Sequence, residues 1–248
     1  MIVRTEAIVL RSVSFGETSQ VVTLYTQTLG TIAVMARGAR GPRSKFGSTL
    51  QPMSHIQVVF YHKPSRQVHT LSEASHISLF KTISKELSRL SIGLRIVEAM
   101  AVLMPRPEAN ERAFVVLLNV LRLLDAAVSH WTNILPFFQL QISALLGFSP
   151  SLDRDQIEAI VEEGGFLRLS DGALFSFKPD QAALPISRRA ARAIGILVHA
   201  RIEHILRMDL DPSTASEVED TVESYLRYHV EDFRPSRSKL VFEQIERS

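Results

Sequence analysis

The sequence contains no cysteine. Disulfide bonds, thiolate metal sites and cysteine nucleophiles are therefore excluded. The absence suits a reducing compartment, although a secreted protein can also lack cysteine.

Long apolar runs are also missing. Polar residues interrupt the stretches at 114–124 and 134–146, and both are too short to cross a bilayer. Arg4 and Glu6 interrupt the first residues, where a signal peptide would need a continuous apolar segment. We therefore expect a soluble, cytoplasmic protein with no membrane contact.

Neither sign of charge dominates the chain, whose net charge is only +2, but the basic and acidic residues are unevenly distributed along it. Of the 28 basic and 26 acidic residues, residues 1–80 contain eight basic and three acidic ones, a net charge of +5. The rest of the chain contains 20 basic and 23 acidic residues, a net charge of −3. This asymmetry predicts that the N-terminal part binds polyanions and that the rest of the protein is neutral or acidic.

Short runs rich in β-branched and aromatic residues, separated by glycine-containing turns, predict strands in the first third of the chain. Five such runs precede residue 78, the number found in a small Greek-key barrel such as the OB-fold. The predicted strands are 2–12, 21–26, 31–36, 55–61 and 67–71.

After residue 78, apolar residues recur at three- and four-residue steps, which predicts amphipathic helices. We expect an α+β fold, with an OB-fold domain at 1–78 and a helical bundle at 79–248. Within 151–186, the Asp171-Gly172 pair predicts a small β-hairpin. The predicted helices are 79–101, 108–128, 134–147, 187–206, one starting at 211–214 with Thr214 and Glu217 as a capping box, and 236–245.

Catalytic and metal motifs find little support. His199 and His204 are five residues apart, which does not place them on one helix face. The segment 38–45 lacks the Gly-Lys-Ser/Thr ending of a phosphate loop, and acid clusters such as Glu217, Glu219 and Asp220 fit a solvated helix face. We expect a protein that is not an enzyme and needs no metal or cofactor.

The strongest local signal is a basic, glycine-rich loop at 37–48. Guanidinium groups match phosphate oxygens, and glycine lets a backbone approach closely, so the loop predicts contact with nucleic acid. A plain solvated loop is the alternative. The loop contributes Arg37, Arg40, Arg43 and Lys45, and Arg11, Lys63 and Arg66 are predicted to extend the basic track.

Three aromatic residues of the predicted barrel are candidates for stacking on bases: Tyr25, Phe46 and Tyr61. Their alternative role is the barrel core, where aromatic residues of small barrels are more often found.

The opening "EAIVLRSVSFGETSQVVTLYTQTLGTIAVMARGARGPRSK" resembles the start of the RecO family of recombination mediators. Leu50-Gln51-Pro52 and Leu71-Ser72-Glu73-Ala74 fit the same pattern. So do "PRPEANERAFVVLLNVLRLLD", "FFQLQISALLGFSPSLD" and "YHVEDFRPSRSKLVF" further along. The similarity covers almost the whole chain, and the order and spacing of the motifs carry it.

The resemblance implies an N-terminal OB-fold, a helical bundle, and a role in strand annealing or RecA loading on single-stranded DNA. It also implies single- and double-stranded DNA, RecR and the acidic tail of single-strand-binding protein as partners, in the bacterial cytoplasm at the nucleoid. Many relatives carry a four-cysteine zinc module, and residues 152–185 have none of those cysteines. Either apolar packing replaces the ion in a zinc-free hairpin, or this element is looser.

The leading hypothesis is a non-catalytic DNA-binding mediator of DNA repair and recombination. The alternative is a protein-interaction adaptor, whose helical part holds the acidic tail of a partner near Arg112 or Arg122, with DNA binding secondary. A metal-dependent nuclease is a third hypothesis, which no motif supports.

Overall fold

The computed structural model describes residues 1–161, 164–234, 236, 238–239 and 242. It divides into two compact units, and each is described by itself. The first comprises residues 1–125 and the described residues from Ser236 on, and the second comprises residues 126–234. The first two long helices thus belong to the same unit as the barrel, and the division into domains at residue 78 stays a prediction.

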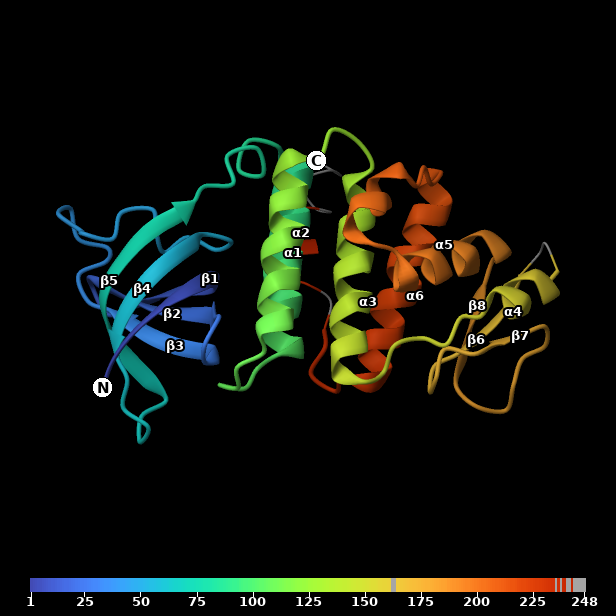
Figure 1. Ribbon diagram of the computed structural model, residues 1–248, viewed down its shortest axis with the longest axis horizontal. Coiled ribbons are helices and arrows are strands. Elements are labelled where there is room, and N and C mark those ends of the chain that lie inside the picture. The colour runs from blue at the N-terminus through green and yellow to red at the C-terminus, as the bar shows by residue number, and fades with distance from the viewer. Residues whose placement is uncertain (162–163, 235, 237, 240–241, 243–248) are drawn as a thin grey trace. The chain divides into compact units, whose positions relative to one another are not determined.

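Five strands close into a barrel, as the sequence predicts, and their order is β1-β2-β3-β5-β4 (Figure 1). The β3–β5 pair is parallel and the other neighbours are antiparallel. In β3, alternate residues starting at Gly30 face the core, and Ile32, Val34 and Ala36 are buried. The strands are β1 (Ile2–Phe15), β2 (Ser19–Thr26), β3 (Gly30–Ala36), β4 (His55–Tyr61) and β5 (Val68–Ser78).

The β2–β3 turn packs against the backbone that connects the first two helices. Gly30 has a φ of 66°, and a Cβ there would overlap the backbone of Glu108. Thr31 donates from its Oγ1 to the carbonyl of Met104 (2.5 Å) and from its amide to that of Arg106 (3.1 Å). Glycine is required at this position because both the positive φ and the close approach exclude a side chain.

The two helices of the first unit are α1 (Leu87–Leu103) and α2 (Glu111–Ala126). The predicted helix 79–101 starts too early, because residues 79–85 form turns or lie outside regular structure. There, the Oδ1 of Asp125 accepts hydrogen bonds from the amides of Thr82 (2.7 Å) and Ile83 (3.1 Å). Phe80 and Ile83 are nevertheless buried, which explains their apolar character.

The described end of the chain returns to α1. Ser236 donates from its Oγ to Glu98 Oε2 (2.5 Å), and Ser238 donates from its Oγ to Oε1 of the same carboxylate (2.8 Å). The predicted helix at 236–245 lies largely outside the described residues, although Ser238 and Lys239 are helical.

The second unit is mostly helical. Asp211 caps α6 by accepting a hydrogen bond from the Thr214 amide (3.0 Å), and bonds from Thr214 and Ser213 hold the pKa of Asp211 below its usual range. The predicted capping box is therefore wrong, since Glu217 bonds instead to the amide and hydroxyl of Ser187. The helices are η1 (Trp131–Asn133), α3 (Ile134–Leu146), α4 (Arg154–Ala159), α5 (Arg188–His199), η2 (Ile202–Arg207) and α6 (Pro212–His229). The predicted helix 187–206 is broken between α5 and η2.

A three-stranded sheet of order β7-β6-β8 occupies the segment where a hairpin is predicted. Its strands are β6 (Gly165–Arg168), β7 (Leu174–Phe175) and β8 (Ala183–Ile186), and the sequence did not predict β8. Leu167 and Leu174 are buried, whereas Phe177 is 71% exposed. Arg168 pairs with Asp171 and lies over the ring of Phe175 at 4.8 Å. Apolar packing and this arginine hold the turn together.

Within the described residues, no helix combines the length and the hydrophobicity that crossing a membrane would require.

Two buried histidines in the barrel have pKa values below the ordinary histidine value. His55 is 1% exposed and its Nε2 lies 2.9 Å from Glu6 Oε2. Burial lowers the pKa of His55 despite this carboxylate, and burial together with the charge of His62 lowers the pKa of His69. The ring centroids of His62 and His69 are 4.5 Å apart.

We predict that the free energy of unfolding decreases as the pH falls below about 6.5, the ordinary histidine pKa. Both pKa values are lowered in the fold, so the unfolded chain binds more protons in that range. Urea unfolding at pH 7.5 and 5.5 measures the loss. A His69→Gln variant should lose less stability between the two pH values, whereas the exposed control His199→Gln should match the wild type. Equal losses in all three proteins would contradict the assignment.

Candidate nucleic-acid interface

The basic loop joins β3 to β4 as a series of turns. Gly41 donates from its amide to the Gly38 carbonyl (3.2 Å), and Ser44 donates to the Gly41 carbonyl (3.0 Å). Gly38 has a φ of 69°, a conformation that favours glycine. The glycines seen in the sequence therefore build the turns that carry the arginines.

Arg40 fastens this loop to the β1–β2 hairpin. Its amide donates to the carbonyl of Thr18 (2.8 Å) and its Nη1 to the carbonyl of Gly16 (3.3 Å). Lys45 fastens the other end, because its Nζ donates to the carbonyl of Ser72 on β5 (2.6 Å) and lies 5.3 Å from the Phe46 ring centroid. The loop is thus held against the barrel at two points.

All seven predicted basic residues are exposed, and none of them forms an ion pair with another described residue. Their positive charge is therefore available to an external anion. The seven are Arg11, Arg37, Arg40, Arg43, Lys45, Lys63 and Arg66.

These seven residues form two groups. Arg37, Arg40, Arg43 and Lys45 lie on the basic loop, beside the hairpin that follows the end of β1, and Arg11 is on β1 four residues before that end. The β4–β5 hairpin, with Lys63 and Arg66, lies at the opposite end of β1, where Ile2 pairs with Tyr61 (Figure 1). The structure therefore brings the loop residues together but separates Lys63 and Arg66 from them.

The stacking predictions for Tyr25 and Phe46 are wrong. Tyr25 is fully buried against Phe114, and burial raises its pKa to about 12. Phe46 is 3% exposed and packs into the barrel core. Their alternative role in the core is the one observed. Tyr61 is 50% exposed and remains a stacking candidate.

The sequence reasoning missed a further exposed aromatic residue, Phe15, which is 58% exposed. It ends β1, directly before Gly16, whose carbonyl accepts a hydrogen bond from the Arg40 guanidinium. A register shift between Val9 and Arg11 explains its orientation, because an extra residue there moves the following odd-numbered side chains out of the core. Phe15 is thus an exposed aromatic side chain beside the basic loop, and a further candidate for stacking on bases.

Arg112 and Arg122, the residues proposed to hold a partner, are both exposed on α2. Val115 is 46% exposed, three residues after Arg112 and seven before Arg122, so the three share one face of the helix. This face combines an apolar side chain with two positive charges.

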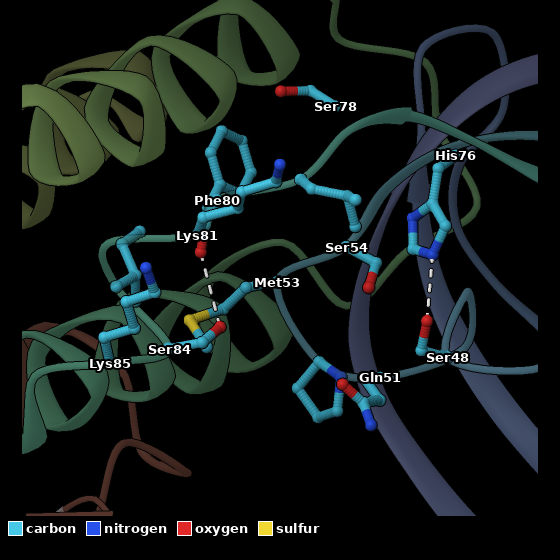
Figure 2. A pocket seen from close by; sticks show the side chains of 13 residues that line it. Ser48, Gln51, Met53, Ser54, His76, Ser78, Phe80, Lys81, Ser84 and Lys85 are labelled. Carbon is cyan, nitrogen blue, oxygen red and sulfur yellow. Dashed lines mark hydrogen bonds between the residues drawn. The ribbon is translucent and has the colours of Figure 1, made fainter.

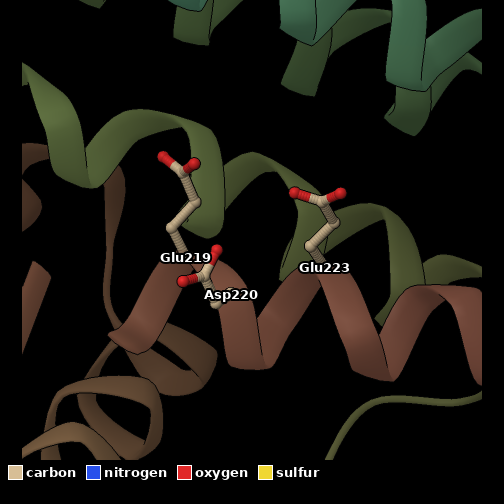
Figure 3. Close-up of side chains that lie close together, drawn as sticks. All are labelled: Glu219, Asp220 and Glu223. Carbon is tan, nitrogen blue, oxygen red and sulfur yellow. The ribbon is translucent and has the colours of Figure 1, made fainter. Parts of the chain in front are cut away.

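An acidic cluster lies on α6, where Glu219, Asp220 and Glu223 come within 4.8 Å of one another (Figure 3). Glu223 is buried and pairs with Arg227, one turn further along. Carboxylates gathered on one helix are common without an ion, and we assign none here.

Comparisons with known proteins match the chain in two segments. The family model "Recombination protein O N terminal" matches residues 1–80, and "Recombination protein O C terminal" matches residues 84–238. The protein named DNA repair protein RecO of Salinibacter ruber is 44% identical over 247 residues, which cover 99% of this chain and 95% of that protein. Proteins of the same name from Chloroherpeton thalassium and Bacillus pumilus are each 26% identical, covering 99% and 91% of this chain and 99% and 88% of their own lengths.

We predict that Phe15→Ala weakens binding to single-stranded DNA by about 1–3 kcal/mol, the usual contribution of one base stacked on an aromatic ring. The salt dependence should stay unchanged, because no charge is removed. Fluorescence anisotropy with a labelled strand at several salt concentrations measures both. Phe177→Ala is the comparison: it removes an exposed aromatic ring from the second unit and should leave binding near that of the wild type. Wild-type affinity in Phe15→Ala would exclude stacking at this position.

Proposed function

The chain belongs to the RecO family, and from this premise we propose that it is a non-catalytic, DNA-binding mediator of recombinational DNA repair. The observation that carries the proposal is the exposed basic loop at 37–48, whose arginines and lysine have no acidic partner within the described structure. The family match and the names of the relatives support a role in repair.

The proposed mechanism is electrostatic. Side chains that neutralise phosphates release condensed counterions, which stabilises the complex and reduces repulsion between two strands. Complementary strands bound by such a surface can meet and anneal. Because phosphate contacts carry no sequence information, we propose binding to single- and double-stranded DNA of any sequence.

The proposal extends to place and partners. We infer that the protein acts in the bacterial cytoplasm at the nucleoid, with RecR and single-strand-binding protein, and so promotes loading of RecA on single strands. Residues 1–78 would serve as the nucleic-acid-binding domain and residues 79–248 as the helical domain. A nuclease is the rival reading, and magnesium-dependent cleavage lost on changing Glu219 and Asp220 would support that reading instead.

The central experiment replaces Arg37, Arg40 and Arg43 together with alanine. Each arginine that touches a phosphate should lower the salt slope of DNA binding by about one when removed, with little sequence preference. The rate of annealing of complementary strands should fall in parallel. Anisotropy across a salt series and a fluorescence annealing assay provide the two measurements.

A matched control changes three exposed arginines of the second unit, Arg189, Arg192 and Arg201, to alanine. This variant loses the same net charge and should keep a salt slope near that of the wild type. An unchanged affinity and slope in the loop variant would remove the loop from the interface.

A second function is favoured by the α2 face of Arg112, Val115 and Arg122. We propose that it binds the acidic, aromatic tail of single-strand-binding protein, with the arginines on its carboxylates and Val115 on its apolar side chain. Titration of a labelled tail peptide should show weaker binding to an Arg112→Ala/Arg122→Ala variant. The loop variant serves as the control and should bind the peptide like the wild type. Equal peptide binding by the α2 variant and the wild type would exclude this face.

A further inference from the structure

A pocket of about 270 Å³ lies in the first unit, beside the barrel (Figure 2). One wall comes from residues 48–54, at the end of the β3–β4 connection. The others come from the last residues of β5 and from residues 79–85, which lead into α1. None of the proposed DNA contacts or partner contacts described above uses these residues.

The charge of the pocket favours an anion. Lys81 and Lys85 line it, both are exposed, and neither has an ion-pair partner among the described residues. No aspartate or glutamate is among the lining residues. An anionic group at the mouth would therefore meet two ammonium groups and no opposing carboxylate.

The interior combines an apolar floor with polar walls. Met53, Phe80 and Ile83 are buried and supply the apolar surface. Figure 2 shows Ser54 facing the same space, and His76 held by a hydrogen bond between its Nε2 and the Ser48 hydroxyl (3.2 Å). Such a mixture suits a flat heterocycle with donors and acceptors along its edge.

Two further features of the pocket lining cost free energy. Nδ1 of His76 is buried and has no hydrogen-bond partner within the described structure. Met53 has a φ of 70°, which non-glycine residues rarely adopt. Its sulfur lies 2.4 Å from the position that a Cβ on residue 93 would occupy. Glycine at position 93 therefore lets Met53 lie flat as the pocket floor.

The pocket continues the basic loop. Ser48 follows Lys45 by three residues, and Lys45 donates to the carbonyl of Ser72, four residues before His76 on β5. A DNA strand that leaves the loop arginines along β5 would thus reach the pocket mouth and its two lysines.

We propose that this pocket receives one unpaired nucleotide of a DNA strand, with its base against Met53 and Phe80 and its phosphate at Lys81 and Lys85. The volume lies near the lower limit of ligand pockets, about 300 Å³, and fits a single nucleotide rather than a stacked pair. A base in a duplex would first have to leave its stack, so the site selects single strands. This inference rests on the proposed DNA binding and extends it from the backbone to the base.

The test compares the full chain bound to an oligo(dT) strand and to an abasic strand of equal length and charge. The wild type should bind oligo(dT) more tightly. In Ser54→Leu, whose side chain fills the pocket, the ratio of the two dissociation constants should fall about tenfold, the size of one lost base contact. The salt slope should not change in this variant, because the loop arginines are intact.

A second variant tests the same pocket in case Ser54→Leu does not fold. Lys81→Ala/Lys85→Ala changes only exposed side chains and should weaken oligo(dT) binding and lower the salt slope, whereas the exposed control Lys178→Ala should do neither. In the wild type, a strand containing 4-thiothymidine should photo-cross-link to a peptide within 48–54 or 76–85.

Three results would overturn the inference alone: an unchanged ratio in folded Ser54→Leu, cross-links only to other segments, or an acidic peptide that competes with oligo(dT) in the wild type but not in Ser54→Leu. In each case the salt slope of DNA binding would still be lower in the loop variant than in the wild type, and the proposed function would stand. If instead the wild type binds neither strand, the proposed function fails and the inference fails with it.

Discussion

The structure depends on β1, the strand that closes the barrel. Its first half, Ile2 to Ile8, pairs with β4, and its second half, Ala7 to Phe15, pairs with β2. One strand of 14 residues therefore holds both of its neighbours in register. A barrel closed in this way has no free edge there, so its backbone hydrogen bonds are satisfied without another chain.

The features that bear on function follow from this closure. The hairpin at the end of β1 supplies the carbonyls of Gly16 and Thr18, which hold Arg40 and with it the basic loop. The bulge after Val9 turns Phe15 outward beside the same loop. The geometry of one strand thus places charged and aromatic side chains together. The β3–β4 connection, which contains the basic loop, ends at residues that line the pocket at His76.

Much of this was predictable from the sequence, and the misses have physical reasons. Alternation along β3 and the glycine turns predict the barrel, because side chains of a strand alternate between core and solvent. The start of α1 was not predictable, because the carboxylate that binds the preceding amides belongs to Asp125, far along the chain. The sequence left Phe46 open between base stacking and the core, and the fold of the loop places its ring in the core, a tertiary effect that no local pattern encodes. The charge of the site was visible in the sequence, but the separation of Lys63 and Arg66 from the loop required the strand order.

The return of the chain to α1 has a consequence for dissecting the protein. Because Ser236 and Ser238 bond to Glu98, the second unit is an insertion between two segments of the first, entered after Asp125 and left before Ser236. A fragment that ends at residue 125 would leave the Glu98 carboxylate without these two donors. A shortened C-terminus would likewise alter the unit that carries the barrel, although those residues follow the second unit in the sequence. Intact excision of the first unit would require a new linker joining its two segments.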